Sequence, residues 1–280
     1  MIRYLFLFII YSLLLTFLNG CGAGSNFNRA KKLEKNKYYV QAIEKYKTIS
    51  RNYSKSKYAP ESLYRAARLY QKELKVYPEG CKLYAELIYK FPEAGSWVRL
   101  AKRGIFDSPD YFPLEEDYLA VEGDSQTGGK NMRLEQYCSL VSTYTYSIVK
   151  KYYAGKKLAT KIKRFYTKEN YELRELSSLK SKSYTVLLSF PFDKMKSWKT
   201  TRDKNVLKMT IVDTNASVKV RAGRFTGCIK VREENPKLPG AYKYEYYAPG
   251  VGHVLTTIGS SKSKVEHRNT ELISYKFSKK

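Results

Sequence analysis

The chain has 280 residues, and 52 Lys and Arg against 26 Asp and Glu give it a formal net charge of +26. The length allows one large domain or two modest ones. The charge favours anionic partners, such as lipid head groups, lipopolysaccharide phosphates, anionic wall polymers or an acidic protein. In a second interpretation, the abundant lysine reflects coding bias and solubility alone.

The chain begins with the features of an export signal. Arg3 precedes an apolar run over residues 4–18, and the small residue Gly20 follows. One positive charge, a short apolar segment and a small residue at the cleavage point are typical of a secretory signal peptide. The run is shorter than the roughly 20 apolar residues of a membrane span. We therefore predict that residues 1–20 are removed; the alternative is an uncleaved anchor.

The end of this segment, Leu18-Asn19-Gly20-Cys21, resembles the bacterial lipobox. The resemblance implies that Cys21 carries a diacylglyceryl group and that acyl chains such as palmitate fix the protein to a membrane. The absence of Asp at position 22 implies transport to the outer membrane. Residues 21–26 are then expected to form a flexible, lipidated tether. Nucleic acid is excluded as a partner, because an exported chain does not meet chromosomal DNA.

The other cysteines are Cys81, Cys138 and Cys228, and no two of them have C-x-x-C spacing. In an oxidising envelope Cys138 and Cys228 could pair, because both fall in the second predicted domain. Ordinary buried thiols are an equal alternative.

Residues 27–106 show helical spacing that repeats along the chain. A set of five small or apolar positions recurs 38 residues later: Tyr39, Ala42, Tyr46, Ile49 and Tyr53 return as Tyr77, Gly80, Tyr84, Leu87 and Phe91. Small residues where helices cross, with aromatic residues between them, are typical of tetratricopeptide repeats. We predict about two and a half such helical hairpins.

The segments 38–46, 53–60 and 66–70 resemble the tetratricopeptide lipoproteins of the BamD type. This resemblance implies a scaffold for other envelope proteins, in particular for outer-membrane assembly. Tyr46, Tyr70 and Tyr84 are the candidate partner-binding residues. The alternative is that these three rings fill the core between the helices.

From residue 111 to residue 280 the pattern changes to alternation, which is typical of an antiparallel sheet. The predicted strands cover residues 156–166, 183–190, 206–212, 217–220, 228–232, 242–247, 253–258 and 272–277. The overall fold class is therefore α+β, with helical hairpins followed by a curved sheet or half-barrel.

The segments 222–231, 246–254 and 271–275, with Phe-Pro pairs at 112–113 and 190–191, resemble the β domain of TapB-like exported proteins. The resemblance implies no catalytic residues. Gly223, Pro249, Gly250 and Gly252 are predicted to form turns, because glycine accepts backbone angles closed to other residues.

A basic cluster interleaved with aromatic residues is the candidate anionic-surface site. Such residues suit a membrane interface or a glycan, with about 1 kcal/mol for each basic residue. The alternative is a solvated strand face. Its members are Lys150, Lys151, Lys156, Lys157, Lys161, Lys163 and Arg164.

Motifs for catalysis, metals and cofactors are absent from the sequence. Residues 123–130 have the wrong spacing for a phosphate-binding loop, and His253 and His267 are the only histidines. No zinc-ligand or serine-nucleophile motif occurs. We predict a non-enzymatic, lipid-anchored envelope scaffold without cofactor or metal. The alternatives are a periplasmic carrier of a lipid or acyl ligand and a basic anchor to the wall.

Overall fold

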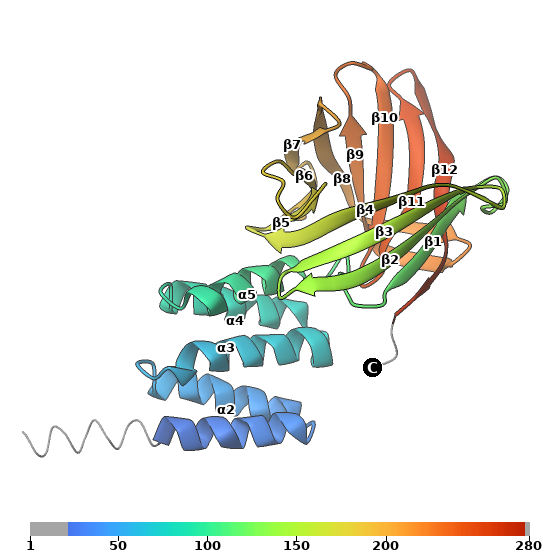
Figure 1. The fold of residues 1–280 in the computed structure, drawn as a ribbon. Helices are drawn as coiled ribbons and strands as arrows, with labels where there is room; N and C mark the ends of the chain where they lie inside the picture. Colours follow the sequence, from blue (N-terminus) through green and yellow to red (C-terminus); the bar gives the residue numbers. More distant parts are fainter. Residues whose placement is uncertain (1–21, 278–280) are drawn as a thin grey trace, which may run out of the picture. The chain divides into compact units, whose positions relative to one another are not determined.

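The computed structural model describes residues 22–277, which divide into two compact units between Ser108 and Pro109 (Figure 1). The predicted signal peptide and Cys21 lie outside the described residues. Between residues 22 and 277, no helix is long and apolar enough to cross a membrane.

The first unit is helical, and each helix packs against the next along the chain (Figure 1). A helix over residues 22–35 is followed by α2 (Tyr39–Asn52), α3 (Tyr58–Leu69), a π-helical turn η1 (Tyr70–Leu74), α4 (Tyr77–Lys90) and α5 (Gly95–Phe106).

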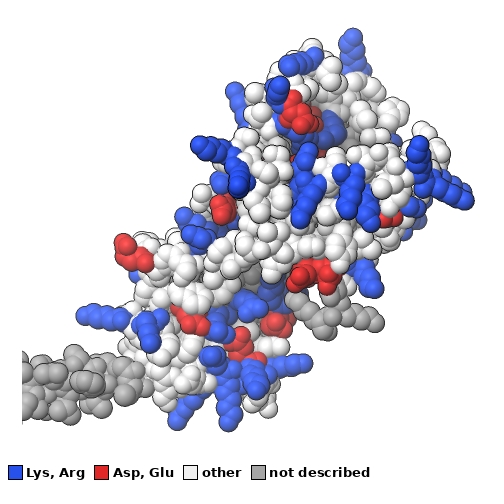
Figure 2. Space-filling model, viewed as in Figure 1, with Lys and Arg blue, Asp and Glu red and all other residues white. Residues whose placement is uncertain are grey.

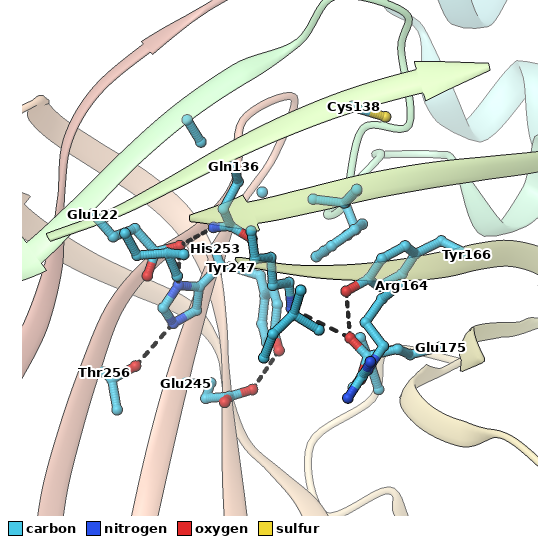
Figure 3. A pocket seen from close by; sticks show the side chains of 18 of the residues that line it. Glu122, Gln136, Cys138, Arg164, Tyr166, Glu175, Glu245, Tyr247, His253 and Thr256 are labelled. Carbon is cyan, nitrogen blue, oxygen red and sulfur yellow. Dashed lines mark hydrogen bonds and ion pairs between the residues drawn. The ribbon is translucent and has the colours of Figure 1, made fainter. Parts of the chain in front are cut away.

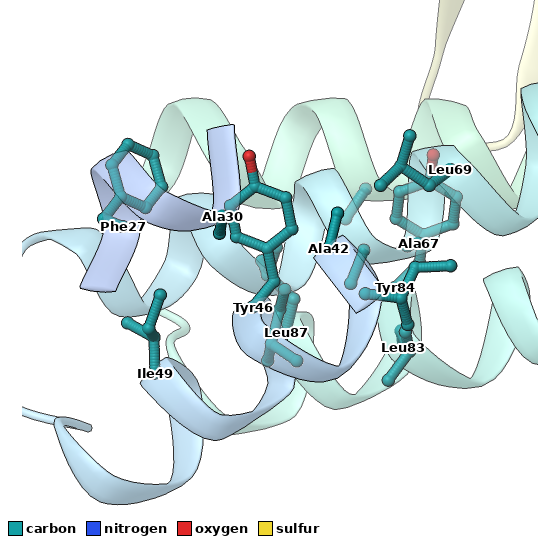
Figure 4. Packing of buried hydrophobic residues seen from close by; sticks show 14 residues of the cluster. Phe27, Ala30, Ala42, Tyr46, Ile49, Ala67, Leu69, Leu83, Tyr84 and Leu87 are labelled. Atoms are coloured by element: carbon teal, nitrogen blue, oxygen red, sulfur yellow. The ribbon is translucent and has the colours of Figure 1, made fainter. Parts of the chain in front are cut away.

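Most of the repeated positions of the sequence lie in the core of this unit or pack against it. Tyr46 on α2 is 0% exposed and Tyr84 on α4 is 1% exposed (Figure 4). Tyr70 is partly buried and packs against this core. The Tyr84 hydroxyl donates to Gln71, whose amide donates to the carbonyls of Gly104 and Asp107. The candidate partner-binding role of Tyr46 and Tyr84 is corrected here, because buried rings present no surface to a partner.

The structure also corrects the prediction of a flexible tether. Residues 22–26 belong to the first helix, and Ala23 is fully buried. A Cβ at Gly22 would lie 3.0 Å from the Tyr53 hydroxyl, and one at Gly24 would lie 3.5 Å from the Tyr58 ring. The small residues thus allow this helix to approach two tyrosines closely, rather than making the segment a linker.

The second unit is a 12-stranded antiparallel sheet in the order β6-β5-β4-β3-β2-β1-β12-β11-β10-β9-β8-β7. In Figure 1, β1 to β4 cross in front of β8 to β12. The strands are β1 (Leu119–Asp124), β2 (Met132–Ser142), β3 (Thr145–Ala154), β4 (Lys157–Glu169), β5 (Glu172–Leu176), β6 (Thr185–Ser189), β7 (Ser197–Arg202), β8 (Asn205–Val220), β9 (Gly223–Glu234), β10 (Ala241–Ala248), β11 (Gly252–Ser260) and β12 (Ser263–Lys276).

Several strands differ from the sequence prediction. The predicted strands 206–212 and 217–220 are parts of the single strand β8, whose ladder to β9 has register shifts. Strands β1, β2, β3, β5 and β7 were not predicted.

The two edge strands, β6 and β7, meet through side chains. Thr200 on β7 accepts a hydrogen bond from the Val186 N–H at 2.7 Å. The Trp198 indole donates to the Val186 carbonyl at 3.1 Å, and the Thr185 hydroxyl donates to the Thr201 carbonyl at 2.8 Å. These contacts replace a backbone ladder, so the sheet forms a nearly closed barrel and closes further than the expected half-barrel.

The turn glycines occupy left-handed backbone conformations. Gly223 (φ 141°) is the first residue of β9, directly after the turn from β8. Pro249 and Gly250 (φ 73°) lie between β10 and β11, and Gly252 (φ 106°) is the first residue of β11. A Cβ is disfavoured at these angles, which accounts for glycine at the tight turns.

In the loop over residues 123–130, the hydrogen-bond donors bind the carboxylate of Asp124. Asp124 accepts hydrogen bonds from the N–H groups of Thr127 and Met132 and from the Thr127 hydroxyl. These bonds lower the pKa of Asp124 to about 2. An internal anion therefore occupies these donors, where a phosphate-binding loop would leave them open.

Candidate functional site

The barrel of the second unit contains a cavity of about 420 Å³ that is partly open to solvent (Figure 3). Its walls are formed by every second residue of the surrounding strands, because alternate side chains of a strand point to the same face. Lining residues include Ala120 and Glu122 on β1, Gln136 and Cys138 on β2, Lys150 on β3, Ile162 and Arg164 on β4, Lys243, Glu245 and Tyr247 on β10, and His253 and Thr256 on β11.

One side of the cavity is a chain of a carboxylate, an imidazole and a hydroxyl. The Oε1 atom of Glu122 lies 3.1 Å from Nδ1 of His253, and Nε2 of His253 lies 3.0 Å from Oγ1 of Thr256. The Gln136 amide donates to the same Glu122 oxygen at 2.6 Å. Burial opposes a charged imidazole, but Glu122 and Glu245 outweigh it and raise the pKa of His253.

A local irregularity of the sheet brings His253 and Thr256 to the same face. Residues three apart on a regular strand point to opposite faces. The β10–β11 ladder shifts register between Tyr246 and Tyr247, so that His253 faces Tyr247 while Thr256 faces Glu245. Bulges of this kind re-aim side chains and are common beside functional sites.

A second network surrounds Glu245. Its carboxylate accepts a hydrogen bond from the Tyr247 hydroxyl and lies 2.8 Å from Lys243. Lys243 also contacts Glu233 at 3.1 Å, and Glu233 pairs with Arg202 at 2.6 Å. Burial favours a neutral Glu245, but Lys243, His253 and Arg202 together hold the pKa of this carboxyl well below its usual range.

A third network lies at the opposite wall, where Glu175 on β5 accepts from the Tyr166 hydroxyl and lies 3.3 Å from Lys150. Burial opposes the charge on Lys150, yet Tyr166 and Glu175 outweigh it and raise the pKa of Lys150. Figure 3 shows Tyr166, Glu175 and Arg164 on one side of the cavity and Glu122, His253 and Thr256 on the other.

The predicted basic cluster is divided between two faces of the sheet, which corrects its interpretation as one surface. Lys150 and Arg164 line the cavity. In the β3–β4 ladder Lys150 pairs with Ile162 and Lys151 with Lys161, so Lys151, Lys161 and Lys163 face outward. Lys156 and Lys157 are exposed at the turn between these strands. The anionic-surface prediction therefore applies to the outward and turn residues only.

The described cysteines are free thiols, and none forms a disulfide. Cys138 lines the cavity, but burial raises its pKa to about 12; burial also raises the pKa of Cys228 to about 11. Both thiols are therefore protonated at neutral pH, and a thiolate nucleophile is not expected.

The arrangement suits polar hydrogen bonding in a preformed space. Both ring nitrogens of His253 are already engaged, so the imidazole orients the Thr256 hydroxyl and Glu122 rather than presenting a free nitrogen. Within residues 22–277, no group of three or more His, Cys, Asp and Glu residues is arranged to hold a metal ion.

No protein-family model and no curated protein matches the chain. Among solved structures, it is similar to a candidate lipoprotein from Parabacteroides distasonis, with 19% identity, a TM-score of 0.41 and coverage of 59% of this chain and 98% of that chain. It is also similar to a β-barrel-like protein of the domain of unknown function DUF1849 from Brucella abortus, with 11% identity, a TM-score of 0.26 and coverage of 58% and 98%. With TM-scores below 0.5, neither similarity indicates a function for this chain.

Sequence reasoning located only part of this site. It named Lys150 and Arg164 for binding an anionic surface and gave no role to His253. It missed Glu122, Glu175 and Glu245. The alternation Ala120-Glu122 and Lys243-Glu245-Tyr247 is the signal that could have identified inward polar positions.

Proposed function

We propose that the protein is a lipid-anchored envelope protein whose β domain binds a small polar ligand without chemical conversion. The observation that carries this proposal is the cavity, whose charged walls are held in fixed hydrogen-bond networks. Ligand pockets commonly have volumes of about 300–1,000 Å³, with a few placed polar groups that fix orientation. The sequence features of the lipobox supply the anchor at Cys21.

The lining favours a polar ligand over an acyl chain. Four carboxylates and four basic side chains reach the cavity, namely Glu122, Glu175, Asp203, Glu245, Lys150, Arg164, Arg202 and Lys243. An acyl chain would remove water from these groups without offering them hydrogen bonds, which is costly. The acyl-carrier alternative is therefore disfavoured, and a ligand with its own hydrogen-bonding groups fits the same walls.

A protein-scaffold role for the helical domain is the second candidate. The repeated pattern of α2 and α4 supports a short tetratricopeptide-type array, as in the BamD type. Large side chains remain on its surface, since Tyr89 is 85% exposed, Val40 64% and Tyr38 56%. Exposed aromatic residues are frequent anchors in protein interfaces. We therefore propose an envelope protein partner for this domain, with the outer membrane as the site of anchoring.

The ligand-binding proposal can be tested by native mass spectrometry of the full chain extracted from membranes in detergent. We expect a small polar molecule to remain bound to the parent protein. Ile162→Trp enlarges a side chain that lines the cavity and should release it. Leu158→Trp alters an exposed residue of the same strand and should not. Equal ligand retention by the parent and Ile162→Trp would contradict the proposal.

A further inference from the structure

The four basic side chains of the cavity differ in how they are paired. Lys150 lies 3.3 Å from Glu175, Lys243 lies 2.8 Å from Glu245, and Arg202 lies 2.6 Å from Glu233. Each of these three cations is therefore committed to a carboxylate of the protein.

Arg164 has no such partner within residues 22–277. Its guanidinium donates at 3.3 Å to the backbone carbonyl of the adjacent Lys163, and no carboxylate of this part of the chain pairs with it. Arg164 nevertheless lines the cavity, close to Tyr166 and Glu175 in Figure 3. It leaves most of its five N–H donors available.

The carboxylates that line the cavity do not pair with Arg164, which leaves its guanidinium open to a ligand. Glu122 is bound by Gln136 and His253, Glu175 by Tyr166 and Lys150, and Glu245 by Tyr247 and Lys243. Asp203, the fourth lining carboxylate, is exposed at the turn between β7 and β8. The negative charges of Glu122, Glu175 and Glu245 are largely balanced by these fixed partners, so Arg164 is the open positive group of the wall.

We propose that Arg164 binds an anionic group, a carboxylate or a phosphate, of the small polar ligand held in this cavity. The inference rests on the proposed binding function. A guanidinium offers two parallel N–H donors that match the two oxygens of such a group, and charge-assisted bonds of this kind are among the strongest.

The opposite wall supplies contacts of a different kind. There, Thr256, Gln136 and the Glu122–His253 pair form a hydrogen-bonding surface. A ligand with an anionic group at one end and hydroxyl or amide groups at the other would fit both walls (Figure 3).

Three probes with the same sugar ring test the charge requirement: N-acetylglucosamine, N-acetylmuramic acid and N-acetylglucosamine 6-phosphate. The first is neutral, the second carries a carboxylate and the third carries a phosphate. Binding to the full chain in detergent is measured by isothermal titration calorimetry. We expect at least one anionic probe to bind at least tenfold more tightly than the neutral sugar, and the tighter of the two identifies the group.

Variants assign the effect to the guanidinium. Arg164→Gln should weaken the anionic probe at least tenfold and leave the neutral sugar unchanged, while Arg164→Lys should recover part of the affinity. Lys161→Gln removes the same charge from the outward face of β4 and should have no effect. Thermal unfolding of each variant checks that it is folded.

The outcomes separate the two proposals. Equal affinity for all three probes, or unchanged anion affinity in Arg164→Gln, overturns the role of Arg164 while the binding function stands. Absence of binding by every probe, together with no molecule retained in native mass spectrometry, overturns both.

Discussion

Nδ1 of His253 on β11 lies 3.1 Å from Oε1 of Glu122 on β1, so one ion pair spans the strand β12 that separates them in the sheet. Both side chains are largely buried, and Gln136 and Thr256 complete the hydrogen bonds of the pair. Glu122 and Glu245 thus favour the charged form of this imidazole inside the barrel, although burial opposes it.

From this pair we predict that the free energy of unfolding depends on pH. The pKa of His253 is raised in the folded protein above its usual 6.5, because the carboxylates outweigh the effect of burial. A group with a raised folded pKa contributes stability that is full below its unfolded pKa and is lost as pH rises through the folded pKa. We expect His253→Gln to lower the free energy of unfolding more at about pH 6 than at about pH 9, as measured by urea unfolding. An equal cost at both pH values would contradict a charged imidazole.

The hydrogen bonds that join β6 to β7 predict how substitutions at this edge change the free energy of unfolding. Thr200→Val leaves the Val186 N–H without its acceptor and should lower the free energy of unfolding by about 1–3 kcal/mol. Trp198→Phe loses one hydrogen bond and should cost about 1 kcal/mol from that bond, with loss of packing in addition. Thr201→Val, at an exposed side chain of the same strand, is the control. The free energies are measured by denaturant unfolding. If Thr200→Val and Trp198→Phe were as stable as the parent and the control, these bonds would not join the two edges.

Gly104 on α5 leaves no room for a side chain beside an aromatic ring of the helical core. A Cβ at this position would lie 2.3 Å from the ring of Tyr84. Gly104→Ala therefore forces the buried ring to move, and overpacking of this kind commonly costs about 1–3 kcal/mol. Gly95→Ala in the same helix meets no atom within 4 Å and should be tolerated. Thermal unfolding would contradict the prediction if the two variants were equally stable.

The outward lysines predict binding to anionic lipid. A triple change of Lys151, Lys161 and Lys163 to Gln removes neighbouring positive charges from one face and should weaken binding to phosphatidylglycerol vesicles, by about 1 kcal/mol for each residue at low salt. Binding is measured by co-sedimentation with the Cys21→Ser chain, so that the lipid anchor does not contribute.

A matched change of Lys204, Lys237 and Lys262 to Gln, all exposed elsewhere in the β domain, controls for net charge. Lys and Arg side chains are spread widely over the visible face in Figure 2, so equal weakening by both triple variants would indicate attraction by net charge rather than by the β3–β4 face.

The helical repeat and the alternating second half could be predicted from sequence because both are local patterns. Ala42, Tyr46 and Ile49 recur as Gly80, Tyr84 and Leu87 on α4, and the structure buries all six. Spacing of three and four residues defines one face of a helix without knowledge of its neighbours. The change of spacing predicts a boundary between residues 106 and 111, and the structure divides into two units between Ser108 and Pro109.

The site depended on relationships that lie outside any local pattern. Alternation shows that Lys150 and Lys151 lie on opposite faces, but only the curvature and closure of the sheet decide which face encloses the cavity. Glu122, Glu175 and Glu245 come from strands far apart in the chain, and strand pairing and a shifted register bring them to the same cavity. The sequence by itself determined the order of helices and strands, because those are set by neighbouring residues. Tertiary structure decided which charges are buried and paired, because pairing distances depend on strand order, register and closure.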